Sequence, residues 1–579
     1  MSKEKKYYLD ELNLKQREVC KSVENYILTA CPGSGKTRTI TYRIAYLQQK
    51  YEMSKLLNIA ITYTNRAAEE IEYRLYDMDV DMQNVWAGTI HQFCMQFIIR
   101  PYAMYSERLK KGYRVIDEYE QLEYVNSIAS ELGVNYRFCN PLQNFRVKEE
   151  YDKLLQRKKE IDFDLILLIS KELITKNRFI AQNVSSIIRS IHVDEFQDTN
   201  ELQYEIIAEL IKCNKLINIL FVGDVNQAIY SGLGGVAKSC SEISRMYGVD
   251  FKEAILDDCY RSTTRIVDYY RNFEVYKTKA KSVSVNKDVY GVIRYNRMIN
   301  KDNLYTEIAQ IIKEQIANGI KENEICIIAP QWYQLYPVSN KLKEMLPTVK
   351  FDAPSMSPFK PKSMNPFYLI AKLLFTVAGT RVRMRKKLAS EIINIFQDEY
   401  KVFIPTSFDV HRFLRILNSV PINETNGVEM YKMAMCVIFR ELGIAIETEK
   451  RLIEAYDSYI CEVTERITKN KILFSYQACC NCFKEREGVV VNTIHGVKGE
   501  EYTTVIAFDL LNGHLPNWSY IVNDDQKSYR TIETKKLLYV LCSRAKQNLY
   551  LFSERGYKTK KGDEYTATDE LNNLSYTYN

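Results

Sequence analysis

A phosphate-binding loop near the start of the chain constrains the fold more than any other feature. Residues 30–37 read ACPGSGKT, which departs from the pattern GxxxxGK[ST] only because Ala30 stands at the first glycine. The preceding NYILTA is apolar enough for a buried strand, and apolar residues recur at helical spacing after the loop. The sequence therefore predicts a strand, a phosphate-binding loop and a helix in succession.

The side chains of this loop suit ATP and Mg²⁺. Gly33 and Gly35 let the backbone approach an anion, Lys36 can reach the terminal phosphates, and the Thr37 hydroxyl can bind Mg²⁺. The alternative is a chance glycine turn before a helix, which the flanking strand and helix patterns disfavour. The predicted nucleotide-binding residues of the loop are Gly33, Ser34, Gly35, Lys36, Thr37 and Arg38.

Two adjacent carboxylates follow a second apolar stretch. In SIIRSIHVDEFQDTN, residues 186–200, Asp194 and Glu195 come at the end of a predicted strand. At the carboxyl end of a parallel strand, one carboxylate can hold Mg²⁺ and the other can orient and deprotonate water. We assign the metal to Asp194 and the catalytic base to Glu195. Apolar runs at 57–62 and 217–224 alternate with helical patterns, which indicates an α/β fold with a parallel sheet.

The composition is that of an ordinary globular protein, with 46% hydrophobic and 26% charged residues. A formal net charge of +7 permits binding to a polyanion without requiring it. The chain has no run of about 18 apolar residues and its start lacks an apolar leader, so we expect a cytoplasmic protein with no membrane partner. The fourteen cysteines then indicate reduced thiols.

Two short patterns carry weaker signals. Cys479 and Cys482 have CxxC spacing, but no second pair or nearby histidine completes a zinc site. Packed thiols are therefore the default interpretation, and metal binding is the alternative. The basic run RVRMRKK at 381–387 could contact a duplex backbone, although a solvated helix face explains it equally well.

Nine motifs, taken in order, resemble a known family. They are LNLKQ, ACPGSGKT, ITYTNRAAEEI, AGTIHQFC, IHVDEFQDTN, LFVGDVNQAIY, YRSTTRIV, VNTIHGVKGEEY and LLYVLCSRAKQNL, from residue 12 to about residue 550. This order is similar to that of the superfamily 1 DNA helicases of the UvrD, Rep and PcrA type, and it covers nearly the whole chain. The resemblance implies two RecA-like parallel-sheet lobes, each interrupted by a mostly helical insertion.

The expected domain boundaries follow from the motifs and from the strand rhythm between them. We expect the first lobe at residues 1–100 and 181–270, with a helical insertion at 101–180. The second lobe is expected at 271–350 and 487–556, with a helical insertion at 351–486 and a tail at 557–579.

The resemblance also implies roles for residues around the nucleotide. Gln16 matches the glutamine that reads the adenine edge, and Tyr260 matches the aromatic residue on which adenine stacks. Gln227 matches the sensor of the terminal phosphate, while Arg261 and Arg544 match arginines that contact this phosphate from either side of the cleft. Such an arginine finger contributes on the order of 10³ to 10⁵ in rate, so Arg544 would tie hydrolysis to lobe closure.

Two adjacent glutamates belong to the same comparison. Glu501 matches the glutamate near the ribose. Its neighbour Glu500 stands where the family usually has leucine, and the sequence gives no reason for the change.

Polar side chains at strand ends, together with two tyrosines, predict a path for nucleic acid. Hydroxyl and amide groups suit contacts to phosphates, which fix position without reading sequence. Tyr63 and Tyr230 could stack on bases, and the alternative for each is a packed residue at the edge of a lobe. The predicted DNA-binding residues are Tyr63, Thr64, Asn65, Thr89, His91, Tyr230, Thr493 and His495.

The resemblance implies an ATP-dependent motor that moves 3′ to 5′ on single-stranded DNA and separates duplex DNA. One departure bears on this function. The family usually has an aromatic residue and an arginine after QAIY, whereas this chain has Gly232 and Leu233. A stacking platform and a positive charge are missing, so we expect a weaker grip on DNA and lower processivity.

An alternative is a DNA-stimulated or nucleotide-sensing ATPase that regulates a partner and unwinds little by itself. Defence systems such as Gabija pair a related UvrD-like subunit with a separate nuclease, and this chain has no nuclease motif of its own. Cleavage would then need a separate nuclease subunit as partner.

Overall fold

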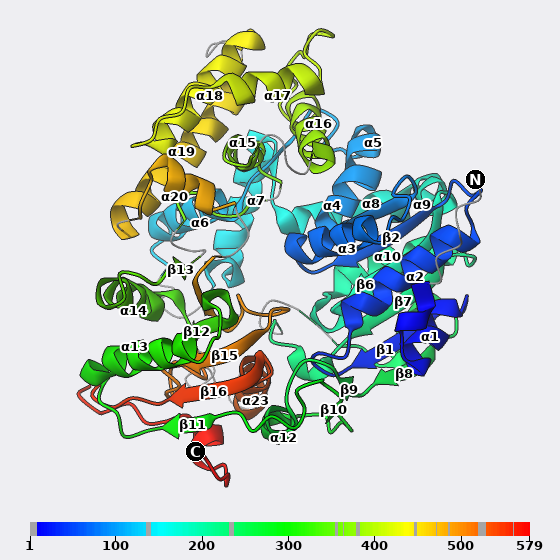
Figure 1. The fold of residues 1–579 in the computed structure, drawn as a ribbon. Coiled ribbons are helices and arrows are strands. Elements are labelled where there is room, and N and C mark those ends of the chain that lie inside the picture. Colours follow the sequence, from blue (N-terminus) through cyan, green and yellow to red (C-terminus); the bar gives the residue numbers. More distant parts are fainter. Residues whose placement is uncertain are drawn as a thin grey trace, which may run out of the picture. The chain divides into compact units, whose positions relative to one another are not determined.

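The computed structural model describes residues 8–134, 140–230, 235, 237–353, 357–362, 364–377, 382–444, 449–470, 472–483, 487–518, 529–559 and 561–579. The chain divides into two compact units (Figure 1). The first unit contains Met1–Ile98, Ser170–Phe351 and Gly488–Asn579. The second contains Ile99–Ile169 and Asp352–Glu487.

The first unit is built on two six-stranded sheets. In the first sheet the strand order is β3-β2-β6-β7-β1-β8, and every neighbouring pair is parallel. The strands are β1 (Tyr26–Ala30), β2 (Leu57–Thr62), β3 (Val85–Thr89), β6 (Ile188–Asp194), β7 (Asn218–Gly223) and β8 (Lys252–Leu256). Because β6, β7 and β1 are neighbours, the residues that follow them meet at one edge of the sheet.

Helices cover both faces of this sheet. Alternate residues of β7 face opposite sides: Leu220 and Val222 join a core with α1, α2 and α3, whereas the Phe221 ring contacts α10 and α11. Burial on both faces explains why these strands read as continuous apolar runs. The helices are α1 (Leu14–Lys21), α2 (Lys36–Lys50), α3 (Asn65–Asp77), α4 (Ile90–Cys94), α9 (Arg178–Ser186), α10 (Glu201–Cys213) and α11 (Cys240–Tyr247).

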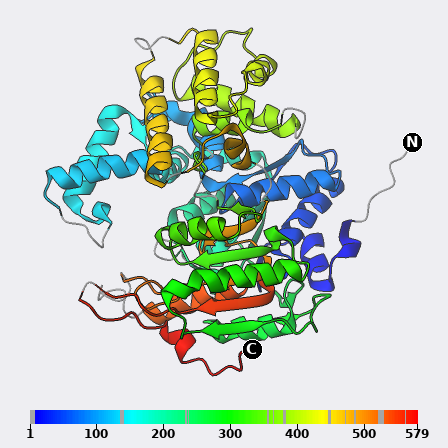
Figure 2. The ribbon, with the colours of Figure 1, turned by 60° about the vertical axis from the view of Figure 1, so that its left-hand side comes forward.

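The second sheet has strand order β11-β16-β15-β12-β14-β13, and the four pairs from β11 to β14 are parallel. Figure 2 shows α13 and α14 lying together over one face of it. Its strands are β11 (Ile293–Asn296), β12 (Ile325–Ala329), β13 (Phe351–Asp352), β14 (Val489–Thr493), β15 (Tyr502–Ala507) and β16 (Ala545–Phe552). Its helices are α12 (Thr264–Tyr270), α13 (Lys301–Ala317), α14 (Trp332–Met345), α23 (Arg530–Cys542) and α24 (Asp569–Asn572). The predicted α/β class with parallel sheets is therefore confirmed.

We call the first sheet with its helices the first lobe and the second sheet with its helices the second lobe. One hydrophobic core joins these two lobes. It contains Cys31 directly after β1 and Cys259 of the short ladder β9 (Asp258–Cys259) and β10 (Lys281–Ser282). In the same core lie Tyr270 of α12 and Tyr539 of α23, whose rings meet edge to face at 5.2 Å. The phosphate-binding loop is thus packed against the second lobe.

The second unit is mostly helical, with one two-stranded parallel ladder of β4 (Arg114–Val115) and β5 (Glu160–Ile161). Lys362, whose side chain is 8% exposed, pairs with both Asp117 and Glu462, which come from segments far apart in the sequence. The helices are α5 (Arg100–Tyr102), α6 (Glu118–Glu131), α7 (Phe145–Lys158), α15 (Pro366–Leu374), α16 (Val382–Asp398), α17 (Val410–Ser419), α18 (Gly427–Glu441), α19 (Lys450–Asn470) and α20 (Tyr476–Asn481), with α8 (Phe163–Lys176) shared between the units.

The structure places the two weaker sequence patterns in this unit. Cys479 is buried against Gly427, and the thiol of Cys482 contacts the carbonyl of Ala478 at 3.2 Å. Burial raises the pKa of both thiols, that of Cys482 to about 11, so neither is a ready thiolate ligand. Across the described residues, no group of three or more His, Cys, Asp or Glu side chains is arranged to hold a metal ion.

The basic run has one member that cannot contact DNA. Arg385 is buried and donates to the carbonyl of Leu373 at 2.7 Å and to Asn418 at 3.1 Å, whereas Lys386 and Lys387 are exposed. Within the part of the chain described above, no helix is long and apolar enough to cross a bilayer.

Candidate functional site

The phosphate-binding loop connects β1 to α2 in the predicted way. Gly33 and Gly35 have φ values of +73° and +84°, in the left-handed region. A Cβ on Gly33 would lie 2.5 Å from the Cβ of Arg261, so this position also needs glycine for space. Ala30 is 1% exposed and its methyl group belongs to the core of the first lobe, which explains why the departure from glycine is tolerated.

Lys36 begins α2 and forms an ion pair with Glu195. Its Nζ lies 3.1 Å from Oε1 and 3.2 Å from Oε2 of Glu195. Burial opposes its charge, but Glu195, Asp224 and Asp194 outweigh that effect and raise the pKa of the lysine. The loop therefore holds a lysine whose charged form is stabilised by the surrounding carboxylates.

Asp194 and Glu195 lie at the carboxyl end of β6 and differ in their ionisation. Burial, and then the charge of Glu195, raises the pKa of Asp194. For Glu195, burial is outweighed by Lys36 and Lys498, which hold its pKa well below the usual range. Glu195 also accepts a hydrogen bond of 2.6 Å from Gln197. An ionised carboxylate held in this way can act as a base.

The residues present fit a magnesium ion. Asp194 is a 5% exposed carboxylate whose pKa is raised by its burial and by the neighbouring charge of Glu195, and a bound cation would favour its ionised form. Thr37 follows Lys36 in the first turn of α2, and α2 comes after β1, which is the strand next but one to β6 in the sheet. Mg²⁺ in nucleotide sites uses one or two protein oxygens together with phosphates, so a larger acidic cluster is not required.

The adenine side is formed by α1 and by the segment before α12. Gln16 and Asn13 form a capping box at the start of α1, and Gln16 also donates to the Ser34 carbonyl at 3.0 Å. The Tyr260 hydroxyl accepts from Asn13 at 2.9 Å, and the tyrosine is 46% exposed, so its ring is available for stacking. Arg38 lies outside this network and pairs with exposed Glu11 at 2.9 Å.

Gln227 connects the two lobes through its side chain. It donates to Asp224 at 2.7 Å and accepts from Arg544 of the second lobe at 3.0 Å. Arg544 is 1% exposed and also donates to the carbonyl of Glu500 at 3.2 Å. Arg261 pairs with Glu501 at 2.6 Å and donates to the Ser543 carbonyl at 3.2 Å. The structure thus brings the predicted sensor and both predicted arginines to one joint between the lobes.

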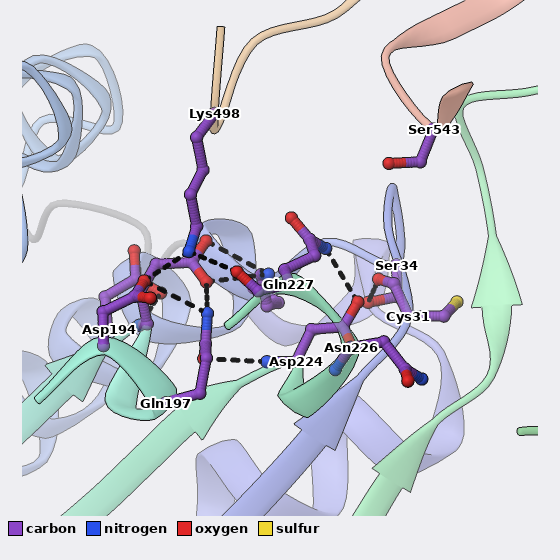
Figure 3. Close-up of polar contacts among 12 residues, drawn as sticks. Cys31, Ser34, Asp194, Gln197, Asp224, Asn226, Gln227, Lys498 and Ser543 are labelled. Atoms are coloured by element: carbon purple, nitrogen blue, oxygen red, sulfur yellow. Dashed lines mark hydrogen bonds and ion pairs between the residues drawn. The ribbon is translucent and has the colours of Figure 1, made fainter. Parts of the chain in front are cut away.

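Lys498 belongs to this joint and was not among the predicted site residues. Figure 3 shows Lys498 reaching towards Gln227 and the end of the first sheet near Asp194. Its Nζ pairs with Asp198, donates to the Gln227 carbonyl at 2.6 Å and lies 5.0 Å from the centre of the Tyr230 ring. Lys498 is part of VNTIHGVKGEEY, so its presence in a recognised motif was the available signal.

Three predicted DNA-binding residues lie together beside Lys498. The Tyr63 and Tyr230 rings stack on each other, with centroids 4.6 Å apart and an angle of 29° between planes. The Tyr230 ring lies 5.5 Å from that of His495, and its hydroxyl donates to the His495 carbonyl at 3.3 Å. Tyr63 is 37% exposed. The tyrosines expected to stack on bases are therefore stacked on each other here.

The predicted threonines all lie at carboxyl ends of parallel strands, where each accepts a backbone hydrogen bond. Thr64 caps α3 by accepting from Ala67 at 3.2 Å, and Thr89 caps α4 by accepting from Gln92 at 3.3 Å. Thr493 accepts from Gly496 at 3.1 Å. Asn65 is the first residue of α3. Burial lowers the pKa of His91 to about 4, so His91 is a neutral polar group at neutral pH. Gly232 and Leu233 lie outside the described residues.

Comparisons with known proteins identify two family models and several relatives that match this chain. The model of the UvrD/REP helicase N-terminal domain matches residues 12–143 and 139–248, and the model of the UvrD-like helicase C-terminal domain matches residues 433–556. Together they match more than half of the chain. An ATP-dependent DNA helicase PcrA of Staphylococcus aureus is 22% identical over 94% of this chain and 83% of its own. A PcrA of Staphylococcus epidermidis is 26% identical over 55% of this chain and 47% of its own.

Proposed function

The chain belongs to the superfamily 1 helicases of the UvrD, Rep and PcrA type, which are ATP-dependent DNA helicases, and we propose that it is a motor on single-stranded DNA. It moves 3′ to 5′ and uses ATP hydrolysis to separate duplex DNA. The observation that carries this proposal is Lys498, which contacts Asp198 and Gln227 of the ATP site and Tyr230 of the proposed DNA path.

Hydrolysis begins with an exchange of partners at Lys36. Its ammonium group is paired with Glu195, and a terminal phosphate of ATP would compete for the same group. When Lys36 binds phosphate, the Glu195 carboxylate is released to orient a water molecule and accept its proton. Thr37 and Asp194 would hold a Mg²⁺ ion, which would neutralise charge on the phosphates.

Movement of the lobes is linked to hydrolysis through Gln227. Its side chain joins Asp224 of the first lobe to Arg544 of the second lobe. When Gln227 turns to a terminal phosphate, Arg544 can follow and stabilise charge on the transferring group. Burial, and then the charge of Arg261, lowers the pKa of Arg544 to about 10, so it remains a cation at neutral pH.

DNA lies along the carboxyl ends of the strands of both lobes. Tyr63, Thr64, Asn65, Thr89 and His91 contact it from the first lobe, and Tyr230, Thr493 and His495 complete the path. To stack on bases, Tyr63 and Tyr230 must first separate from each other, which lowers the net gain below the full stacking energy. We also propose the domain boundaries given above and a cytoplasmic location.

Unwinding of tailed duplexes tests this function and its direction. The substrates are one duplex with a 3′ single-stranded tail and a matched duplex with a 5′ tail, each incubated with ATP and Mg²⁺. We expect strand separation on the 3′-tailed duplex and none with Glu195→Gln, which keeps the shape of the side chain and removes the base. Unwinding only from the 5′ tail would contradict the polarity, and unwinding by Glu195→Gln would contradict the role of Glu195.

The departure at Gly232 and Leu233 favours a second candidate, a partner-regulated ATPase. The site would then drive a conformational change that controls a nuclease subunit in defence against phage. ATP hydrolysis without unwinding until that partner is added would support this function. Replacing Gly232 with Phe and Leu233 with Arg should raise single-strand affinity and unwinding, and no gain would contradict our interpretation of the departure.

A further inference from the structure

Glu500, which stands where the family usually has leucine, has a charged partner in the other lobe. Its carboxylate forms an ion pair with the guanidinium of Arg66, and it also accepts a hydrogen bond from the Tyr502 hydroxyl. The two charged residues are separated by 434 positions in the sequence. A leucine at position 500 could make neither contact, so this ion pair is a property of the present chain.

Arg66 lies in the proposed DNA path. It is the second residue of α3, directly after Asn65 and Thr64, at the end of β2. Its side chain is 63% exposed, whereas that of Glu500 is only 11% exposed. The arginine therefore reaches from an open surface to a largely buried carboxylate. A guanidinium at this place is also the group that best binds the oxygens of a phosphate.

The backbone of Glu500 belongs to the joint at the ATP site. Its carbonyl accepts a hydrogen bond from Arg544, and the next residue, Glu501, pairs with Arg261. One short segment thus contacts Arg66 on the DNA side of the first lobe and both predicted phosphate-contacting arginines. A change of partner at Arg66 would therefore alter the contacts of the segment that holds Arg544.

We propose that Arg66 is a DNA phosphate-binding residue and that Glu500 is its competing anion. Without DNA, the Glu500 carboxylate occupies the guanidinium. When single-stranded DNA binds along Thr64 and Asn65, a phosphate takes over Arg66, and the pair between the lobes breaks. DNA binding thereby loosens the segment that carries Glu500 and Glu501. This inference rests on the proposed DNA path.

The test is the affinity for a single-stranded oligonucleotide at several salt concentrations, measured with the full chain and without nucleotide. Glu500→Gln frees Arg66 and should tighten binding about two- to fivefold, as expected for loss of a partly exposed ion pair. Arg66→Gln should weaken binding and reduce the slope of log affinity against log salt by about 0.7, the value for one phosphate on a single strand. The double variant should behave like Arg66→Gln alone.

Arg74→Gln is the matched control, because Arg74 lies on the same helix and has its own exposed partner, Glu70, at 2.7 Å. It should leave the salt slope unchanged. An Arg66→Gln variant that keeps the slope of the unmodified chain overturns the proposal, and so does a Glu500→Gln variant that binds DNA more weakly. If the unmodified chain binds no single-stranded DNA at all, the proposed function itself fails, which is a distinguishable result. Thermal unfolding of each variant shows whether it is folded.

Discussion

Replacing Lys498 with methionine should weaken the joint between the lobes, and the loss should grow with pH. The side chains of Lys498 and Asp198 are 7% and 0% exposed, so their ion pair is buried. Burial raises the pKa of Asp198 from 3.8 to about 6, and Lys498 is the largest influence that lowers it. The neighbours Glu195 and Lys36 act in opposite directions on the same carboxyl group.

The raised pKa of Asp198 determines how the free energy of unfolding changes with pH. Because the pKa of Asp198 in the folded protein lies above its ordinary value, ionisation of Asp198 destabilises the folded joint. This penalty grows as the pH rises from 3.8 to about 6. With Lys498 present, this penalty stops growing above that pH. Without Lys498 the pKa of Asp198 rises further, so the penalty keeps growing by about 1.4 kcal/mol for each pH unit. Relative to the unmodified chain, the free energy of unfolding of the variant should therefore fall by ~1.4 kcal/mol at pH 7 and by ~3 kcal/mol at pH 8. The second figure approaches the cost of breaking a buried ion pair.

The assay is the apparent thermal midpoint of Lys498→Met and of the unmodified chain at pH 6, 7 and 8, together with ATP hydrolysis with and without single-stranded DNA. The difference in midpoint should widen from pH 6 to pH 8, and stimulation by DNA should fall. Lys341→Met is the control, because Lys341 and Glu344 are 53% and 68% exposed and their pair should contribute little at any pH. A difference that is the same at pH 6 and pH 8 would show that Lys498 does not govern the ionisation of Asp198.

Three further predictions concern single residues of the site. Arg544→Ala should lower the rate of ATP hydrolysis by on the order of 10³ or more with little change in ATP affinity, as single-turnover rates and nucleotide binding can show. Gly33→Ala should weaken ATP binding, because its Cβ would lie 2.5 Å from that of Arg261, and titration with a fluorescent ATP analogue measures this. Tyr63→Ala should weaken single-strand binding by about 1–3 kcal/mol at most, whatever the base sequence, since its ring must first leave Tyr230. An unchanged hydrolysis rate for Arg544→Ala, an unchanged ATP affinity for Gly33→Ala or an unchanged single-strand affinity for Tyr63→Ala would contradict the respective prediction.

The sequence was sufficient for the fold of the nucleotide site because its signals are local. A strand, a glycine loop and a helix follow one another within residues 25–50, and Asp194 comes directly after an apolar run. Parallel strands buried on both faces read as apolar runs, which also indicated the first sheet. The tight packing behind Gly33 could not be predicted in the same way, because Arg261 is far away in the chain.

Contacts between distant segments were beyond the sequence. Nothing in the residues around Lys498 or Glu500 identifies Asp198 or Arg66 as a partner, since an ion pair leaves no spacing pattern between segments hundreds of residues apart. The pairing of Lys362 with Asp117 and Glu462 within the helical unit was hidden for the same reason. The roles assigned to the site residues remain predictions that the experiments above address.

The most direct test of the account is the rate of ATP hydrolysis at saturating ATP and Mg²⁺, measured with single-stranded DNA of increasing length. Glu195→Gln, prepared in parallel, excludes a contaminating ATPase. We expect DNA to raise the rate strongly, the effect to increase with length up to a plateau, and Glu195→Gln to abolish hydrolysis. A rate that is the same with and without DNA at every length would contradict the claim that this ATP site drives a motor on DNA.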